Sequence, residues 1–307
     1  MDTLLEIKRL QKEKNAVILA HFYQIPEIQD IADFVGDSLD LSRKSADTDA
    51  DIIVFAGVNF MAETAKILSP EKKVLIPDRE AGCSLADSCP PDEFRKFRDK
   101  YPDHIVVSYV NTTAEIKAMT DICCTSTNAV EIIESIPREQ KIIFAPDRNL
   151  GNYLNRITGR NMVVWDGACH VHEEFSLERI MKLKGEFPDA KLISHPECQN
   201  PILIASDFIG STSALLKFTG SDDSKEYIVA TESGILHQMK KQNPGKLFMP
   251  APPLDSTCGC SDCIFMKMHT VKKVYNSLNE EKFEVDVEPE IREKAVIPIK
   301  RMLEVSR

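Results

Sequence analysis

Three stretches of this chain, each twenty residues long, resemble one another when they are aligned without gaps: residues 19–38, 107–126 and 193–212. Their shared positions carry an isoleucine, then an aspartate, then a final hydroxyl: Ile28, Ile116 and Ile202; Asp33, Asp121 and Asp207; Ser38, Ser126 and Thr212. Their third position is His21, Tyr109 or His195. Similarity in register at several positions indicates one structural unit copied three times.

The segments around each copy alternate between helix and strand patterns. An amphipathic helical run leads into an apolar strand before each copy, and helix, strand, helix and strand patterns follow its hydroxyl. Such alternation predicts parallel sheets covered by helices. We therefore expect an α/β protein of three pseudo-symmetric three-layer α/β/α domains around a pseudo-three-fold axis. The expected domains are 1–83, joined by C-terminal helices within 264–307, then 84–169 and 170–263.

A cysteine follows the last predicted strand of each domain: Cys83, Cys169 and Cys263. Cys83 and Cys169 are 86 positions apart, as are Ser126 and Thr212, so the cysteine belongs to the repeat. Ligand sites of parallel α/β sheets lie beyond the carboxyl ends of the strands, where these loops are expected. The sequence predicts that the three thiols meet there.

Three thiolates from distant segments suit zinc or three irons of a [4Fe–4S] cluster, and the ligand type does not choose between them. The simpler alternative is that cysteines are small buried apolar residues, which is our interpretation of Cys123, Cys124 and Cys198. In CGCSDC we assign the ligand to Cys263, because an apolar helical stretch, IFMKMHTVKKVYNSL, begins directly after it. Cys258 and Cys260 are left as thiols or as a disulfide.

The three hydroxyls, Ser38, Ser126 and Thr212, each stand where a helix pattern begins. As N-caps they would accept hydrogen bonds from the free backbone N–H groups of the first helical turn. Three helix N-termini directed at one axis would also bind phosphate or carboxylate groups. We expect both roles to coexist.

Polar pairs spaced i, i+2 leave the first strand of each domain: His21 with Tyr23, Tyr109 with Asn111, and His195 with Glu197. In an extended segment both members of a pair face the same side. They supply groups for proton transfer and donors for a developing oxyanion. Arg79 and Arg148, each in a PDR triplet, either bind carboxylates or pair with nearby acids.

Composition narrows the class of partner. The net charge of −10 and the lack of long basic runs argue against binding to nucleic acid or anionic membranes. No apolar stretch reaches the roughly 18 residues that suggest a membrane span. Nine scattered cysteines argue for metal or redox use in a reducing compartment. These features predict a cytoplasmic protein that acts on small molecules.

Several motifs resemble those of the A-type quinolinate synthases of NAD biosynthesis, nearly from end to end: AHFYQIPEIQDIADFVGDS, YVNTTAEIKA, APDRNLG, HPEC and ATESGILHQMKK. The resemblance implies condensation of iminosuccinate with dihydroxyacetone phosphate to quinolinate, phosphate and water. It also implies a [4Fe–4S] cluster rather than zinc, with an open iron acting as a Lewis acid. An enzyme that supplies iminosuccinate would be a functional partner.

Carried over residue by residue, the resemblance assigns cluster ligands, substrate contacts and an acid–base candidate. The ligands are Cys83, Cys169 and Cys263. The substrate contacts are His21, Ser38, Tyr109, Val110, Asn111, Ser126, His195, Pro196, Glu197 and Thr212, and Tyr23 joins His21, Tyr109, His195 and Glu197 as a catalytic candidate. The C-x-C-x-x-C spacing of CGCSDC departs from the family pattern. The alternatives are a non-catalytic iron–sulfur redox sensor and a zinc-dependent lyase or aldolase.

Overall fold

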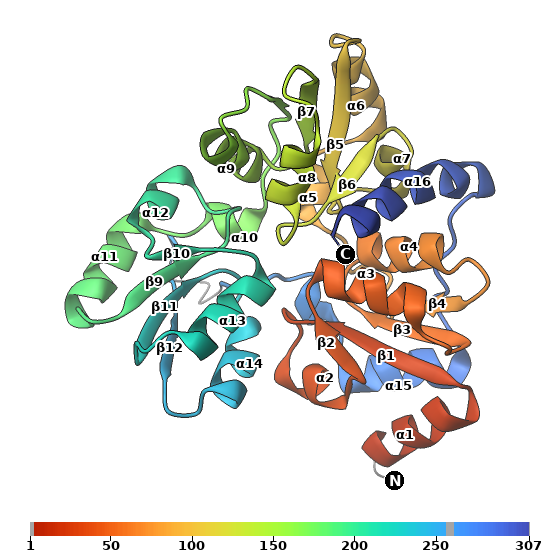
Figure 1. The fold of residues 1–307 in the computed structure, drawn as a ribbon. Coiled ribbons are helices and arrows are strands. Elements are labelled where there is room, and N and C mark those ends of the chain that lie inside the picture. Colours follow the sequence, from red (N-terminus) through yellow and green to blue (C-terminus); the bar gives the residue numbers. More distant parts are fainter. Residues whose placement is uncertain (1–2, 256–260, 307) are drawn as a thin grey trace.

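The computed structural model describes residues 3–255 and 261–306. Over this part of the chain the fold is α/β, with three four-stranded parallel sheets that form three lobes (Figure 1). In each sheet the second strand of the unit lies at one edge and the fourth at the other, with the first and third between them. The prediction of three similar α/β/α units is confirmed, and the domain boundaries remain a proposal.

The first unit has the sheet order β2-β1-β3-β4. Its strands are β1 (Ala16–His21), β2 (Phe34–Gly36), β3 (Ile52–Ala56) and β4 (Lys73–Leu75). Its helices are α1 (Thr3–Glu13), α2 (Pro26–Ile31), α3 (Ser38–Asp47) and α4 (Asn59–Leu68).

The second unit has the order β6-β5-β7-β8. Its strands are β5 (His104–Tyr109), β6 (Ile122–Cys124), β7 (Lys141–Ala145) and β8 (Val163–Val164). Its helices are α5 (Ser84–Asp87), α6 (Pro91–Arg98), α7 (Ala114–Lys117), α8 (Ala129–Ser135) and α9 (Arg148–Thr158).

The third unit has the order β10-β9-β11-β12. Its strands are β9 (Lys191–Ser194), β10 (Phe208–Ile209), β11 (Glu226–Ala230) and β12 (Leu247–Pro250). Its helices are α10 (His170–Glu173), α11 (Leu177–Glu186), α12 (Asn200–Ala205), α13 (Thr212–Ser221) and α14 (Ile235–Gln242).

The repeated aspartate fastens the first strand of each unit. Its carboxylate accepts a backbone N–H of that strand: Asp33 from Ile18 (2.7 Å), Asp121 from Val106 (2.8 Å) and Asp207 from Leu192 (2.8 Å). The repeated isoleucines are buried in the cores beneath. Much of the repeat therefore exists because each unit needs the same strand anchor and the same core contact.

The C-terminal segment contains η1 (Met266–Met268), α15 (Val271–Glu280) and α16 (Pro289–Val305). The prediction of a single helix directly after Cys263 is wrong. Thr270 caps α15 by accepting the N–H of Lys273 (3.2 Å), so a new helix starts there. α15 packs against α1 and β3, whereas α16 packs against α7 and β6 of the second unit and α4 of the first. Within the described ranges, no helix has the length and apolar character needed to cross a membrane.

Candidate active site

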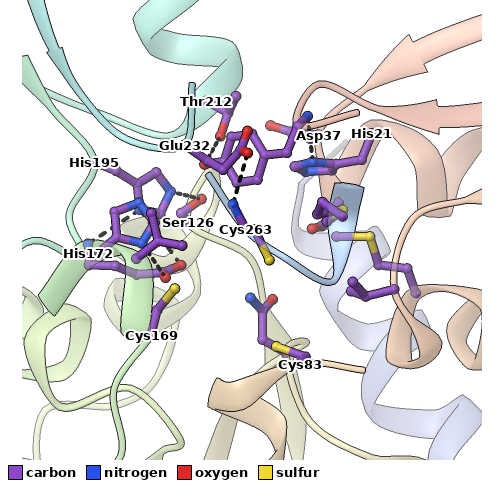
Figure 2. Close-up of a pocket in the computed structure, with 18 of the residues that line it drawn as sticks. His21, Asp37, Cys83, Ser126, Cys169, His172, His195, Thr212, Glu232 and Cys263 are labelled. Atoms are coloured by element: carbon purple, nitrogen blue, oxygen red, sulfur yellow. Dashed lines mark hydrogen bonds and ion pairs between the residues drawn. The ribbon is translucent and has the colours of Figure 1, made fainter. Parts of the chain in front are cut away.

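A cavity of about 60 Å³ lies where the three units meet (Figure 2). Residues of all three units and of the C-terminal segment line it: His21, Tyr23, Asp37, Ser38, Val58, Phe60, Met61, Cys83, Tyr109, Asn111, Thr125, Ser126, Cys169, Val171, His172, His195, Glu197, Thr212, Glu232, Cys263 and Met266. None of these described lining residues is Lys or Arg. An anionic ligand would therefore be held by neutral donors, by helix N-termini or by a metal.

The three predicted ligand cysteines share this cavity, and Figure 2 shows their side chains directed into it. The loops that carry them touch one another directly after each cysteine. The hydroxyl of Ser84 lies 2.7 Å from Nδ1 of His170, and the rings of His170 and Phe265 meet edge to face with centroids 6.3 Å apart. The repeat thus brings together three thiols that are far apart in the sequence.

The surroundings of these thiols suit a cationic centre. Burial raises the pKa of Cys83 to about 12, with Cys263 adding to the rise. Burial also raises the pKa of Cys169 well above its ordinary value, and Cys83 and Cys263 add to it. Three thiolates that share one cavity repel one another, and a bound metal centre removes that penalty by neutralising them. The donor set therefore fits a thiolate-bound metal or cluster.

The remaining described cysteines, Cys89, Cys123, Cys124 and Cys198, are fully buried in apolar cores. This burial agrees with the interpretation of Cys123, Cys124 and Cys198 as packing residues. Cys258 and Cys260 lie outside the described residues.

His21 and His195 have the same local structure in the first and third units. Nδ1 of His21 accepts the N–H of Tyr23 (3.2 Å), and Nδ1 of His195 accepts the N–H of Glu197 (3.3 Å). The proton of each neutral ring is therefore on Nε2. Nε2 of His195 lies 3.0 Å from the hydroxyl oxygen of Ser126. Burial lowers the pKa of His21 to about 4 and that of His195 to about 3. Both rings are neutral donors near pH 7.

The sequence suggested that the pairs spaced i, i+2 lie on extended backbone. In the structure they do not. The chain turns after β1 and after β9, where the N–H of Gln24 bonds to the carbonyl of His21 and that of Cys198 to the carbonyl of His195 (both 3.0 Å). The turns form because Nδ1 of each histidine accepts the N–H two residues on. Tyr23 and Glu197 still line the cavity.

A chain of polar contacts crosses the cavity from Tyr23 to Tyr109. The hydroxyl of Tyr23 lies 2.9 Å from that of Thr212 and 2.7 Å from that of Thr231. Thr231 lies 3.0 Å from Nε2 of His172.

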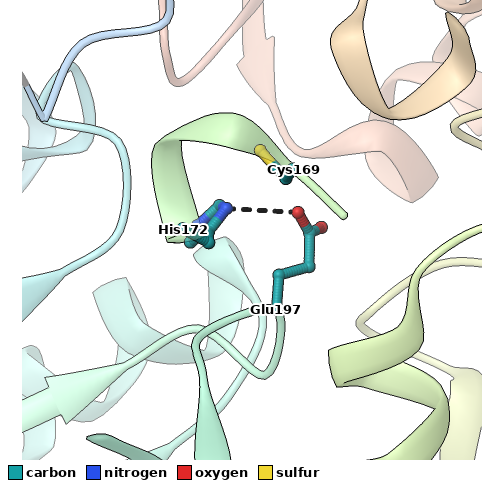
Figure 3. A group of neighbouring side chains, drawn as sticks. All are labelled: Cys169, His172 and Glu197. Carbon is teal, nitrogen blue, oxygen red and sulfur yellow. Dashed lines mark ion pairs between the residues drawn. The ribbon is translucent and has the colours of Figure 1, made fainter. Parts of the chain in front are cut away.

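Beyond His172 the contacts continue through a carboxylate. Nδ1 of His172 lies 3.2 Å from Oε2 of Glu197, and Oε1 of Glu197 accepts the hydroxyl proton of Tyr109 (2.7 Å). Cys169, His172 and Glu197 offer sulfur, nitrogen and oxygen atoms within 4.8 Å of one another, a grouping able to hold a metal ion (Figure 3). Groups that can carry protons and groups that can bind a metal therefore lie next to one another at this site.

The electrostatics of these groups differ by residue. Burial raises the pKa of Glu197, but His172, His195 and the Tyr109 hydroxyl outweigh it, so the balance lies below the ordinary value. Burial raises the pKa of Tyr23 and Tyr109 well above the ordinary value, and Glu197 adds to both. Near pH 7 the site combines an ionised carboxylate with protonated phenols.

The hydroxyls Ser38, Ser126 and Thr212 line the cavity, but none is an N-cap, and that expectation is wrong. Asp37 caps α3 through the N–H groups of Leu39 and Asp40 (both 3.0 Å), and Ser211 caps α13. Ser126 precedes α8, whose N-cap is Asn128. At α3 and α13 the residue before the predicted hydroxyl supplies the cap, because it is the last one with extended backbone before the helix.

Four predicted residues lie apart from the cavity lining. Val110 and Pro196 are buried next to lining residues. Arg148 pairs with Asp166 (3.2 Å) and Glu173 (2.6 Å), and Arg79 stacks on the ring of Phe283. Both arginines therefore make local contacts within the described structure.

Sequence reasoning missed four polar residues that line the cavity, Asp37, Thr125, His172 and Glu232, as well as Thr231, which contacts Tyr23 and His172. His172 follows Cys169 by three residues, one helical turn, and this spacing was an available signal. Asp37 and Thr125 had a weaker one, since each directly precedes a repeated hydroxyl. Thr231 and Glu232 lie in the motif ATESGILHQMKK, but the repeat gave no signal for them, because their contacts are with other segments of the chain.

Comparison with known proteins places this site in a family. Residues 5–304 match the family model described as quinolinate synthetase A protein. The chain is 56% identical over 306 residues to the quinolinate synthase of Thermosynechococcus vestitus, covering 100% of this chain and 96% of the relative. It is 54% identical over 307 residues to that of Chloroherpeton thalassium (100% and 95%) and 58% identical over 297 residues to that of Prochlorococcus marinus (97% and 89%). The chain therefore belongs to the quinolinate synthetase A protein family and is an enzyme of that family.

Proposed function

We propose that this enzyme is a quinolinate synthase, which condenses iminosuccinate with dihydroxyacetone phosphate to quinolinate, phosphate and water. The full-length similarity to relatives named quinolinate synthase supports the assignment. The observation that carries it is the junction of the three units, where three cysteines share one cavity with His21, Tyr109 and His195. We further propose that the enzyme is cytoplasmic and that its partner is an enzyme supplying iminosuccinate.

In this proposal Cys83, Cys169 and Cys263 hold a [4Fe–4S] cluster. Three protein thiolates leave one iron without a protein ligand. When bound, the cluster supplies a Lewis acid that polarises a substrate oxygen. The mutual approach of the three loops and the raised thiol pKa values support this ligand set, because a cationic centre would stabilise the thiolates.

Neutral donors and helix N-termini bind the anionic substrate groups. The Nε2–H groups of His21 and His195, the amide of Asn111 and the hydroxyls of Ser38, Ser126 and Thr212 provide hydrogen bonds. Val110 and Pro196 contribute by packing next to these residues rather than as donors, because Pro196 has no N–H and the N–H of Val110 bonds to the carbonyl of Cys124. The N-terminus of α13 has an uncharged cap, Ser211, and so favours phosphate or carboxylate. The N-terminus of α3 is already partly neutralised by Asp37.

The contacts from Tyr23 to Tyr109 handle protons. Glu197, ionised and 3.2 Å from Nδ1 of His172, is the proposed proton acceptor. Tyr23 and Tyr109 keep their protons and donate to developing negative charge on oxygen. These polar contacts are buried, which excludes bulk water. Protons therefore pass directly from one of these side chains to the next.

Anaerobic purification followed by iron and sulfide analysis and a quinolinate assay tests the proposal. We expect about four irons and four sulfides per chain and quinolinate formation from iminosuccinate and dihydroxyacetone phosphate. A protein that contains zinc but no sulfide would refute the cluster and favour a zinc lyase. An iron–sulfur protein that makes no quinolinate would refute the activity and favour a redox sensor.

A further inference from the structure

Glu232 is a fully buried carboxylate two residues beyond β11, on the cavity wall. Its Oε1 accepts the backbone N–H of Cys263 (3.0 Å), a contact visible in Figure 2. Its Oε2 accepts the N–H of Gly234 (2.7 Å). One side chain thus joins the end of a core strand to the backbone of a proposed cluster ligand.

Lys267 completes the arrangement from the other side of Cys263. Its Nζ lies 2.7 Å from Oε1 of Glu232 and donates to the carbonyl of Tyr23 (2.7 Å). Its backbone N–H donates to the carbonyl of Cys263 (3.1 Å). Both backbone polar groups of Cys263 are therefore held by the Glu232–Lys267 pair, which also reaches the first unit.

Cys263 lies farther along the chain from the last strand of its unit than the other two cysteines do. Cys169 follows the end of β8 by five residues and Cys83 follows β4 by eight, whereas Cys263 follows β12 by 13. A longer connection restricts its end less. The position equivalent to Glu232, two residues beyond the third strand, is Val58 in the first unit and Asp147 in the second.

We infer that Glu232 is a positioning residue that fixes the backbone of Cys263, so that its thiol faces Cys83 and Cys169. Glu232 touches neither thiol nor substrate in this role. It acts by holding one N–H group in a buried hydrogen bond. Burial raises the pKa of Glu232 to about 7 and Lys267 opposes that rise, so above pH 7 the bond is charge-assisted and among the stronger contacts that a side chain makes with backbone. The part that concerns the cluster rests on the proposed function, whereas the placement of the thiol does not.

The test treats the metal-free, reduced full chain with iodoacetamide and measures the rate at which each thiol is alkylated. Mass spectrometry with fragmentation assigns each alkylated site. In Glu232→Gln we expect Cys263 to react about tenfold faster or more, because a charge-assisted bond is lost, while Cys83 and Cys169 change little. Glu232→Asp, which keeps the charge, should fall between. Glu63→Gln is the matched control, because Glu63 also accepts a backbone N–H, that of Ala114 (3.1 Å), without lining the cavity.

A second readout uses the reconstituted enzyme, in which Glu232→Gln should release iron to a chelator about 10- to 100-fold faster than the wild type. Equal acceleration of all three thiols, no acceleration at Cys263, or failure of both variants to fold would overturn the local role. Should the wild type take up no cluster, the proposed function fails, while the alkylation rates still decide the role of Glu232.

Discussion

His21 and His195 are buried rings whose Nδ1 atoms already accept a backbone N–H. Their folded pKa values, about 4 and about 3, lie below the value of about 6.5 in an unfolded chain. A lowered histidine pKa gives stability that is present above pH 6.5 and is lost as the pH falls toward the folded value, because the unfolded chain then binds more protons.

The free energy of unfolding of the metal-free protein should therefore fall between pH 7.5 and pH 5.5 by about 1.4 kcal/mol for each of these histidines. Urea denaturation at both pH values measures it. In His195→Gln the loss should be smaller by that amount. Identical losses in the variant and the wild type would contradict the assignment of a neutral, buried His195.

Glu197→Gln tests the proposed proton acceptor. An amide cannot take up the proton, so we expect kcat to fall by about 10²- to 10⁴-fold. Iron and sulfide content should be unchanged, because no cluster ligand is altered. Activity within about tenfold of the wild type, with the cluster intact, would remove Glu197 from this role.

The sequence revealed mainly those site residues that belong to the repeat. His21, Tyr109 and His195 stood out because they share one repeat position. The contact of Glu197 with Tyr109 joins the third unit to the second, and no spacing within one unit encodes it. The turn after each strand was also missed, because it depends on a histidine accepting a backbone N–H.

At the scale of single elements, the repeated aspartate anchors the first strand of each unit. We expect Asp121→Ala to lower the free energy of unfolding by about 1–3 kcal/mol, since the N–H of Val106 loses its charged acceptor. Asp121→Asn, which keeps an acceptor oxygen, should cost less. Urea denaturation checks both. Asp103→Ala, at an exposed position, should change stability by no more than about 0.5 kcal/mol, and an equal loss there would contradict the anchor.

Helix starts show where sequence patterns fell short. Ser38 and Thr212 looked like caps because each is a hydroxyl before a helical pattern. Asp37 and Ser211 supply the caps instead, which leaves the predicted hydroxyls at the cavity. Two adjacent residues that can both cap cannot be ranked without the backbone conformation.

At the scale of the whole molecule, α16 joins the first two units. Ala295, Ile299 and Met302 of this helix are fully buried in the core cluster that these units share. We expect Met302→Ala to lower the free energy of unfolding by about 2–5 kcal/mol, measured by urea denaturation. Ile297→Ala, at a position 50% exposed, should cost no more than about 0.5 kcal/mol. Similar costs at both positions would mean that α16 does not join the units.

The arrangement of the three units was the part that the sequence predicted best. Equal spacing of strands, helices and cysteines is a property of the repeat, so parallel sheets with loops meeting at one place followed from it. The path of the C-terminal segment was harder to predict, because it has no copy elsewhere in the chain.

The central claim is that Cys83, Cys169 and Cys263 hold one iron–sulfur centre. Its most direct test is the iron–sulfur absorbance of anaerobically reconstituted single variants, with Cys198→Ser as the control because the thiol of Cys198 lies in a core and donates to the carbonyl of Ala230 (3.2 Å). We predict that Cys83→Ser, Cys169→Ser and Cys263→Ser each lose the absorbance, while Cys198→Ser keeps it. Full absorbance in any of the first three, or its loss in Cys198→Ser alone, would contradict the claim.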